Sequence, residues 1–327
     1  PGLLSEVSVI GLGRAIAAAS ATGGDTVIAT TIGVNLVDQN GATTVIGSDE
    51  GPPPSEVAVS PDGRYALLEG QARAELWSID SGLVAAFDGA TSGTFTADGA
   101  VLMTSSPSQV TAGPATETPQ TVIAAPAGTE LGAAAMTPDG QVIAAPVTGD
   151  GPDLITYTAS AGAITTDIFV EPERKIARAD YGGRRDRLLL QVSSQDPFAS
   201  QLVAWDSDAG QVVWETAAGS SSTNSVWDVG LDGRVLTAEG SALRLIGLEG
   251  TVEGEWQLDG SRTVMSVVAT ESGYALALSD GTLLLTGIDG GPGGPSVSIG
   301  RRIVDLERLE GLDGVITVDT SGVVQAW

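Results

Sequence analysis

The sequence of 327 residues contains neither cysteine nor histidine. Without cysteine the chain forms no disulfide bond and offers no thiolate ligand to a metal ion. Without histidine it lacks the side chain that most often serves as a general base and as a transition-metal ligand. We therefore expect a protein that is not an enzyme and that holds no cofactor and no metal.

Basic residues are also scarce. The chain has 15 lysines and arginines against 41 acidic residues, which gives a formal net charge of −26. Nucleic-acid binding depends on basic residues that neutralise phosphates, so no nucleic-acid partner is expected. A halophilic origin would explain strong acidity, but only 17% of the residues are charged, which is low for that explanation. An exported bacterial protein is the better interpretation.

Long apolar runs are missing too. The most apolar stretch, Val7 to Ala19, is interrupted by Gly11, Gly13 and Arg14. Because a membrane-spanning helix needs about 20 consecutive apolar residues, no transmembrane segment is expected in this chain. The sequence starts at Pro1 without methionine, which fits a processed or trimmed form and leaves open whether a signal or anchor was removed. The expected location is extracytoplasmic, either secreted or anchored at the outer side of the cytoplasmic membrane.

What the sequence does contain is a repeated turn. Ser60-Pro61-Asp62-Gly63 has proline second and glycine fourth, which suits a type I turn, and Thr137-Pro138-Asp139-Gly140 repeats it. Related turns place a glycine about every 40 residues, at Gly24, Gly63, Gly99, Gly140, Gly183, Gly233, Gly273 and Gly314. A second series marks another hairpin, at Gly41, Gly82, Gly162, Gly210, Gly250 and Gly290.

Each repeat unit is interpreted as four short strands. In one unit they are expected at Ser55 to Ser60, Arg64 to Leu68, Ala74 to Ile79 and Leu83 to Phe87. Four strands in every unit of roughly 40 residues are typical of a β-propeller blade. We therefore predict an all-β fold in which residues 1–327 form a single β-propeller domain.

The number of units predicts eight four-stranded blades. Seven are complete, while the eighth begins near Arg301 and supplies only three strands before Trp327. A single strand, Ser5 to Ile10, precedes the first complete blade. We expect it to become the fourth strand of the last blade, which closes the ring and removes two exposed sheet edges. A seven-bladed ring with a loose tail is the alternative.

Small and aromatic residues have regular places in the units. First strands are rich in small residues, as in Ala15 to Ala19 and Gly132 to Ala135, which suits strands near a crowded central axis. An alanine-rich helix would fit each segment alone, but each segment ends at a hairpin turn. Trp77, Trp205 and Trp327 occupy equivalent third-strand positions, and we expect them to pack between neighbouring blades.

Two stretches carry a resemblance to known repeats. Ala204-Trp205-Asp206 followed by Gly210 to Trp214 resembles the quinoprotein repeat, and Leu76 to Asp80 resembles a WD repeat. The chain is thus similar to bacterial β-propellers of the WD-repeat and quinoprotein-like (PQQ-like) superfamily. Quinoprotein dehydrogenases hold their cofactor with a vicinal cysteine pair and a calcium site. Because this chain has no cysteine, the resemblance implies the non-catalytic branch, which includes envelope scaffolds.

Loop lengths differ between the two faces of the predicted ring. The Pro-Asp-Gly turns share one face with short third-to-fourth-strand turns, and the opposite face carries longer connections such as Gly47 to Ser55. Because binding residues tend to lie on loops held by a rigid scaffold, we predict a partner-binding surface on this longer-loop face. Its candidate residues are Glu50, Pro53, Glu69, Arg73, Asp150, Asp153, Asp196, Phe198 and Asn224. Phe198 is the expected apolar anchor.

A basic cluster surrounds the turn at Tyr181-Gly182-Gly183. Its members are Arg174, Lys175, Arg178, Arg184, Arg185 and Arg187. These side chains either pair with the acidic residues around them or form a docking spot for an anionic partner, in which Arg184 and Arg185 would take part.

These observations predict a non-enzymatic protein–protein interaction scaffold of a bacterial cell envelope. The scaffold is expected to be monomeric on its own and to bind another protein in an envelope or membrane complex. The alternative is a carbohydrate-binding protein or a carboxylate-based enzyme acting at the channel mouth. In that alternative, paired acids such as Asp150 and Asp153 would serve as general acid and base.

Overall fold

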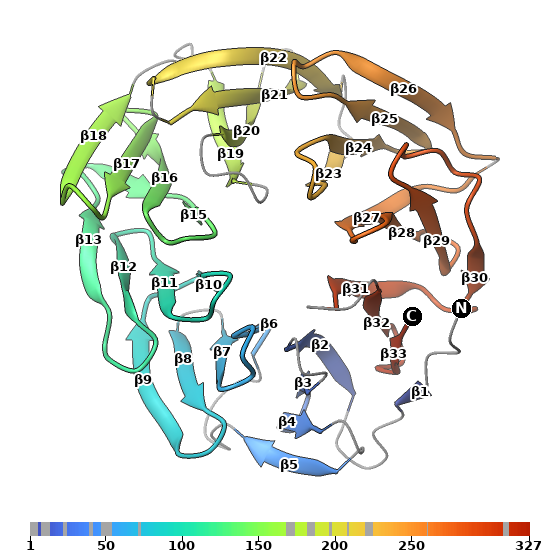
Figure 1. Cartoon of the computed structure of the whole chain (residues 1–327), viewed down its shortest axis with the longest axis horizontal. Helices are drawn as coiled ribbons and strands as arrows, with labels where there is room; N and C mark the ends of the chain where they lie inside the picture. Colours follow the sequence, from blue (N-terminus) through green and yellow to red (C-terminus); the bar gives the residue numbers. More distant parts are fainter. Residues whose placement is uncertain are drawn as a thin grey trace.

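The computed structural model describes residues 6–7, 14–21, 25–38, 42–46, 54–70, 73–167, 174–181, 187–195, 198–207, 209–219, 225–259, 261–309 and 314–327. These residues form 33 strands. The strands belong to eight antiparallel sheets that stand as blades around one axis (Figure 1). The described residues include no helix able to cross a membrane. The predicted all-β, eight-bladed propeller is confirmed, and the seven-bladed and helical alternatives are wrong.

The blades follow one another along the chain. Blade 1 consists of β2 (Ala15–Ser20), β3 (Thr26–Thr30), β4 (Gly33–Val37) and β5 (Thr43–Ile46), and blade 2 of β6 (Glu56–Val59), β7 (Tyr65–Glu69), β8 (Arg73–Ser78) and β9 (Gly82–Asp88). Blade 3 consists of β10 (Ser92–Phe95), β11 (Val101–Ser105), β12 (Gln109–Pro114) and β13 (Gln120–Ala124). Blade 4 contains β14 (Thr129–Leu131), β15 (Ala135–Met136), β16 (Val142–Gly149), β17 (Leu154–Thr158) and β18 (Ala163–Asp167).

The second half of the ring repeats the pattern. Blade 5 consists of β19 (Arg174–Asp180), β20 (Arg187–Gln195), β21 (Phe198–Asp206) and β22 (Gln211–Gly219), and blade 6 of β23 (Ser225–Val229), β24 (Val235–Glu239), β25 (Ala242–Ile246) and β26 (Val252–Gln257). Blade 7 consists of β27 (Val264–Ala269), β28 (Gly273–Leu278), β29 (Thr282–Gly287) and β30 (Ser296–Ser298). Blade 8 contains β31 (Ile303–Arg308), β32 (Val315–Asp319) and β33 (Val324–Ala326).

The fourth strand of blade 8 comes from the start of the chain. The strand β1 (Glu6–Val7) pairs antiparallel with β33, with Glu6 opposite Gln325 and Val7 opposite Val324. Figure 1 shows β1 beside β33, next to blade 1. The predicted closure by the N-terminal strand is confirmed for these two residues, and the remainder of the predicted strand lies outside the described residues.

Blade 4 differs in its first strand, which is divided into β14 and β15. Both parts pair with β16, but the register advances by one residue between them, since Leu131 faces Val147 and Ala135 faces Ala144. Pro146 lies opposite the interruption, where Gly132 N–H donates to its carbonyl at 2.9 Å. Proline has no N–H to return to the ladder, which accounts for a local break in regular pairing.

The Pro-Asp-Gly turns have one geometry. The Ser60 hydroxyl donates to Asp62 Oδ1 at 2.7 Å and accepts from Tyr65 N–H at 2.9 Å, so both side chains stabilise their own turn. Gly63 has a φ of 71°, which side-chain-bearing residues rarely adopt. The hydroxyl-to-carboxylate contact recurs at Thr96–Asp98 and at Thr137–Asp139, each at 2.7 Å. The repeat recognised in the sequence is therefore a repeat in hydrogen bonding.

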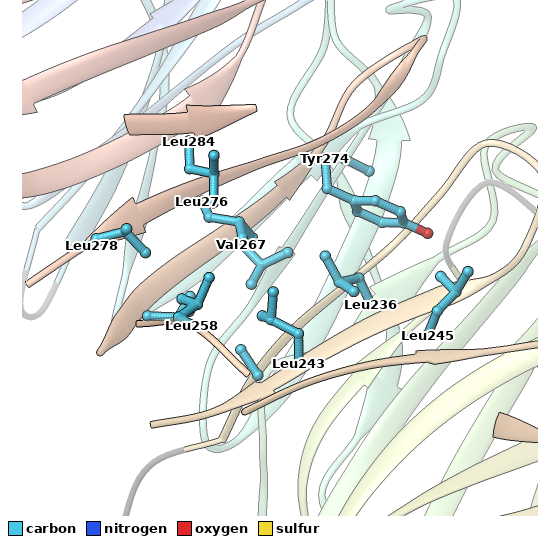
Figure 2. Close-up of a cluster of buried hydrophobic side chains, with 12 residues drawn as sticks. Leu236, Leu243, Leu245, Leu258, Val267, Tyr274, Leu276, Leu278 and Leu284 are labelled. Carbon is cyan, nitrogen blue, oxygen red and sulfur yellow. The ribbon is translucent and has the colours of Figure 1, made fainter. Parts of the chain in front are cut away.

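The core consists of apolar layers between neighbouring blades. Figure 2 shows one of them, in which Leu236 and Leu243 of blade 6 face Val267 and Leu276 of blade 7. All four are buried, and each fully buried aliphatic side chain contributes about 1.5–3 kcal/mol. Because each blade shares apolar layers with its neighbours, the ring is stabilised by contacts that run around it.

The predicted tryptophan positions belong to these layers. Trp77 packs with residues of blades 1 and 2, Trp205 with residues of blades 4 and 5, and Trp327 with residues of blades 7 and 8. The expectation that the three tryptophans pack between blades is confirmed.

Candidate functional site

The alternation of strand direction gives the ring two faces. The turn face carries the connections from first to second and from third to fourth strands. The loop face carries the connections from second to third strands and from each blade to the next. Third-to-fourth turns contain the second glycine series, with positive φ at Gly82, Gly162, Gly210, Gly250 and Gly290. The candidate residues chosen from the sequence can be placed against these two faces.

Three described candidates lie at the loop face with side chains open to solvent or partly so. Arg73 begins β8, is half exposed, and forms ion pairs with Glu75 at 3.1 Å and with Asp88 at 4.0 Å. Asp150 and Asp153 lie in the β16–β17 connection of blade 4, where Asp150 is exposed and Asp153 is half-buried. The loop face therefore presents charged side chains from blades 2 and 4.

The remaining surface candidates cannot be placed in the same way. Glu50, Pro53, Arg184, Arg185, Asp196 and Asn224 lie outside the described residues, and for Phe198 only the backbone, at the start of β21, is described. The partner-binding role of these residues stays a prediction.

Glu69 departs from the sequence-based interpretation. The sequence predicts a residue of the partner surface, but the Glu69 side chain is only 5% exposed, at the end of β7. Its Oε1 accepts a hydrogen bond of 2.9 Å from the backbone N–H of Gly93, in the first strand of blade 3. Burial raises the pKa of Glu69 to about 7; the nearby Glu56 also raises this pKa, and the Gly93 hydrogen bond opposes the shift.

Two further carboxylates link blades in the same way. Asp305 of blade 8 accepts from Ala18 N–H of blade 1 at 3.1 Å, and Asp228 of blade 6 accepts from Ala269 N–H of blade 7 at 2.7 Å. Burial raises the pKa of Asp305, and it raises the pKa of Asp228 to about 6. First-strand N–H groups have no neighbouring strand on the inner side, so these carboxylates satisfy donors that the ladder leaves unpaired.

Several acidic side chains line one small cavity near the loop face. Glu56, Glu69, Asp305 and Glu307 line a space of about 180 Å³ together with residues of blades 1 and 3. The described residues contain no group of three or more acidic side chains arranged to hold a metal ion. Sequence reasoning missed this cluster. The available signal was the occurrence of Glu56 in a first strand that is otherwise small or apolar, and of Asp305 and Glu307 in another first strand.

The basic cluster in blade 5 has structural contacts where it is described. The guanidinium of Arg178 lies 4.1 Å from the ring centroid of Trp227, and its Nη1 donates to the Trp227 carbonyl at 3.0 Å. Arg178 also pairs with Asp180 at 3.1 Å, and Arg187 donates to the carbonyl of Leu248. These two arginines join blade 5 to blade 6, in addition to any role of the cluster in docking.

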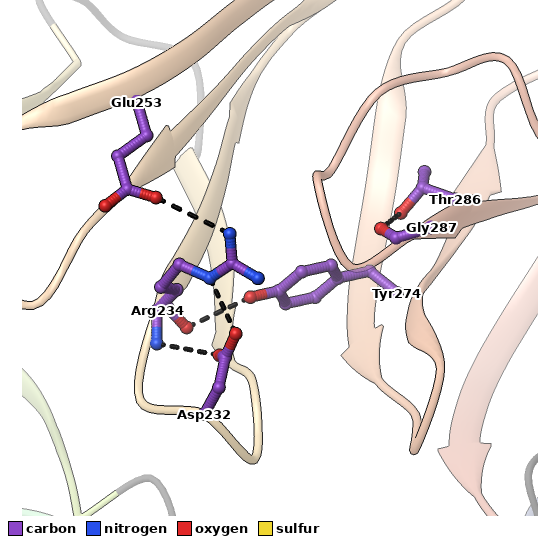
Figure 3. Close-up of polar contacts among 6 residues, drawn as sticks. All are labelled: Asp232, Arg234, Glu253, Tyr274, Thr286 and Gly287. Atoms are coloured by element: carbon purple, nitrogen blue, oxygen red, sulfur yellow. Dashed lines mark hydrogen bonds and ion pairs between the residues drawn. The ribbon is translucent and has the colours of Figure 1, made fainter.

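A polar junction joins blades 6 and 7 at the turn face, as Figure 3 shows. Arg234 pairs with Asp232 at 2.6 Å and with Glu253 at 3.5 Å. Tyr274 reaches from blade 7, and its hydroxyl donates to the Arg234 carbonyl at 3.0 Å. Burial is the main cause that raises the pKa of the Tyr274 hydroxyl, which keeps it a hydrogen-bond donor. This junction holds blades 6 and 7 together.

No protein-family model matches the sequence, and no curated protein matches it significantly. Solved structures do share its fold. The Dos1 propeller has a TM-score of 0.75 at 10% identity, over 98% of this chain and 93% of that one. The C-terminal WD40 domain of Sif2 has a TM-score of 0.71 at 15% identity, over 99% and 97%. The computationally designed Ika8 protein has a TM-score of 0.74 at 12% identity, over 98% and 99%.

At these identities the likeness shows the fold alone. The chain has a WD40-type β-propeller fold. The comparisons do not assign it to the quinoprotein-like branch or to bacteria, and those expectations from the sequence stay predictions.

Proposed function

We propose that this protein is a non-enzymatic scaffold that binds another protein through its loop face, in a bacterial cell envelope. The propeller fold is typical of interaction scaffolds, because it holds many loops in fixed positions on one rigid ring. The observation that carries the proposal is that two blades place charged side chains on the loop face. Blade 2 presents Arg73 there, and blade 4 presents Asp150.

The negative net charge of the chain indicates the kind of partner it binds. A chain with a formal net charge of −26 attracts basic surfaces over a Debye length of about 8 Å at physiological ionic strength. Asp150 and Asp88, whose side chain is 94% exposed, place part of this charge at the loop face. A partner with a basic patch is therefore favoured, and its association should be faster at low salt than at high salt.

The proposal is tested by capturing partners from the envelope fraction of the source organism. A variant with Arg73→Glu and Asp150→Arg changes the loop face, and Arg64→Glu changes the turn face as a matched control. Arg64 suits this purpose because its side chain is 75% exposed. We expect a defined partner to be retained by the wild type and the control and lost with the loop-face variant. Equal retention by both variants, or no partner at all, would overturn the proposal.

The basic cluster is a second candidate for partner binding, separate from the loop face, and it has its own test. If Arg184 and Arg185 dock an anionic partner, changing both to Glu weakens binding in a salt-dependent way and leaves the melting temperature unchanged. Unchanged affinity together with a lower melting temperature would assign them to ion pairing within the chain.

The envelope location is part of the proposal and has its own experiment. Fractionation of the source cells, with detection of the native protein by antibody, should place it outside the cytoplasm. Recovery only in the cytoplasmic fraction would contradict the envelope location. The scaffold function would then be tested by partner capture alone.

A carboxylate-based enzyme or carbohydrate-binding protein is the second candidate, and one observation favours it. Glu69, with a pKa raised to about 7, lies beside a second acid, Glu56, in a small cavity. Such a pairing allows one acid to donate a proton while the other stays ionised. A glycan-binding and glycosidase screen between pH 5 and 8 tests this candidate, with Glu69→Gln as the inactive variant. Activity that survives Glu69→Gln would exclude this site.

A further inference from the structure

One cavity lies at the turn-face end of the channel. Its volume is about 610 Å³, within the range of about 300–1,000 Å³ that is usual for ligand sites. Its lining comes from blades 1, 2, 3, 4, 6 and 8. Because so many blades contribute, the cavity is a property of the closed ring and lies at the end of the channel opposite the loop-face predictions.

Two residues of the cavity wall each have a buried polar atom that lacks a hydrogen-bond partner. Among the described residues, Ser20 Oγ, Asn35 Oδ1 and Arg308 Nε are the buried side-chain polar atoms without a hydrogen-bond partner. Ser20 and Arg308 both line the cavity, and each is the last residue of its blade's first strand, on adjacent blades. A buried donor without a partner is unfavourable, and a small shift of either side chain toward the cavity would let a ligand there satisfy it.

The charge of Arg308 selects the kind of molecule. No ion pair joins Arg308 to any carboxylate of the described residues, whereas Arg178, Arg234, Arg244 and Arg262 each have one. A neutral acceptor would satisfy the Nε hydrogen but leave the guanidinium charge unpaired. A carboxylate satisfies both, since its oxygens can accept from the guanidinium and from the Ser20 hydroxyl. A polyanion is disfavoured because Glu307 also lines the cavity.

The rest of the cavity wall favours a ligand with an apolar part. Phe95, Met136 and Val59 line the cavity. Leu231, in the turn of blade 6, is 57% exposed at its edge. Large apolar side chains around one charged group are typical of sites that bind a small amphipathic ligand.

We propose that the turn-face mouth of the channel is a binding site for a ligand that carries a single carboxylate on an apolar body, with Arg308 and Ser20 holding the carboxylate. The ligand is a free organic acid or the C-terminal residue of a peptide, which share this chemistry. The site is independent of the proposed scaffold function, because it lies on the other face and uses other residues.

The test uses the chain's 3 methionines as reporters. Met136 lines the proposed site, Met265 lines a different cavity beside β31, and Met103 is buried in blade 3. With ¹³C-methyl-labelled methionine, 3-phenylpropionate should shift the Met136 signal in a saturable way and leave Met265 and Met103 unchanged. The neutral 3-phenylpropionamide should bind at least about tenfold more weakly, because it lacks the charge-assisted pair.

Variants locate the binding. Arg308→Gln should weaken 3-phenylpropionate binding by at least about tenfold and leave binding of the amide unchanged, while Arg64→Gln should alter neither. Ser20→Ala is a second variant in case Arg308→Gln fails to fold, and the comparison of acid with amide needs no variant. Equal affinity for acid and amide, or no saturable Met136 shift up to about 10 mM ligand, would overturn the proposal.

The source of the carboxylate is resolved with a peptide. Acetyl-Ala-Phe with a free C-terminus and the same peptide with a C-terminal amide form the second pair of probes. Tighter binding of the free-acid peptide than of 3-phenylpropionate would identify the ligand as a chain terminus. Tighter binding of 3-phenylpropionate would identify it as a free organic acid.

Discussion

In blade 6 the hydroxyl of Tyr274 occupies the place beside the turn carbonyl that a hydroxyl of the turn itself occupies in blade 2. In blade 2, Ser60 Oγ lies 3.3 Å from the carbonyl of Tyr65, which also accepts from the backbone N–H of Ser60. In blade 6 the corresponding residue is Gly230, whose N–H donates to the carbonyl of Arg234. Tyr274, from blade 7, donates to that same carbonyl at 3.0 Å. The turn is completed by the neighbouring blade.

This relationship predicts how two positions depend on one another. Tyr274→Phe should lower the free energy of unfolding by about 1 kcal/mol, since one buried hydrogen bond is lost. Gly230→Ser should destabilise more, because a Cβ at this glycine would lie 2.7 Å from the Tyr274 hydroxyl oxygen.

The double variant distinguishes this account from simple additivity. Phenylalanine at 274 removes the closest contact of a serine at 230 and leaves those to Asp232 Oδ1 at 2.9 Å and to the ring Cζ at 3.3 Å. After a small shift of the Asp232 side chain, the serine hydroxyl can take the place beside the Arg234 carbonyl. Chemical denaturation of the four proteins should therefore show that the double variant is more stable than Gly230→Ser alone. Losses that simply add would contradict the replacement of one hydroxyl by the other.

The repeat was predictable because its turns depend only on residues that are close in the sequence. A turn such as Ser60 to Gly63 needs a hydroxyl, a carboxylate and a glycine at fixed spacing, and each of these can be recognised without knowing the fold. Ring closure by β1 followed from the same counting, since a three-stranded last unit leaves one edge to be filled.

The inner carboxylates could not be predicted in the same way. Glu69 precedes a glycine near the end of a strand and so resembles a loop residue. Its inward position depends on Gly93, one blade further on, where a Cβ would come within 2.4 Å of the Leu67 side chain. Ser20 and Arg308 likewise come to line one cavity only when the last blade closes against the first. The repeat pattern places the tryptophans that pack between blades, but it does not encode these non-local contacts of single polar residues.

Arg178 should matter for stability more than its exposed surroundings suggest. Its guanidinium lies over Trp227 and donates to the Trp227 carbonyl of the next blade. Arg178→Ala should lower the free energy of unfolding by about 1–2 kcal/mol through loss of the cation–π contact and a charged hydrogen bond. Lys175→Ala, at an exposed position in the same strand, is the control and should change little. Equal melting temperatures for the two variants would show that the contact between Arg178 and Trp227 does not stabilise the fold.

Removing the first strand should expose the edge of blade 8. Two residues of β1 are paired with β33. Their backbone hydrogen bonds contribute about 1–3 kcal/mol together, and β33 would become a free edge that can pair with another chain. A deletion of residues 1–10 should lower the melting temperature and promote aggregation, measured by calorimetry and light scattering. A deletion of Pro1 and Gly2 alone should do neither, and a ten-residue deletion that stays monomeric and melts like the full chain would contradict closure.

The buried acids predict a stability that falls as the pH rises. The pKa of Glu69 is about 7 in the folded protein against 4.5 as its ordinary value. Between these values the folded chain holds a proton that the unfolded chain has lost, so unfolding releases it. The stabilisation is complete below pH 4.5 and is lost as the pH rises through 7. Asp228, with a pKa raised to about 6, acts in the same direction.

Glu69→Gln isolates this contribution, because the amide oxygen can still accept from Gly93 N–H but cannot ionise. The variant and the wild type should have similar free energies of unfolding at pH 5. At pH 8 the variant should be more stable, by up to about 3 kcal/mol for a shift of this size. Asp88→Asn, which removes a carboxylate that is 94% exposed, is the control and should not reproduce this crossover. Urea unfolding at the two pH values makes the measurement. The opposite result would be a wild type that becomes more stable than Glu69→Gln as the pH rises. It would show that the fold stabilises the Glu69 carboxylate, so that its pKa is lowered and not raised.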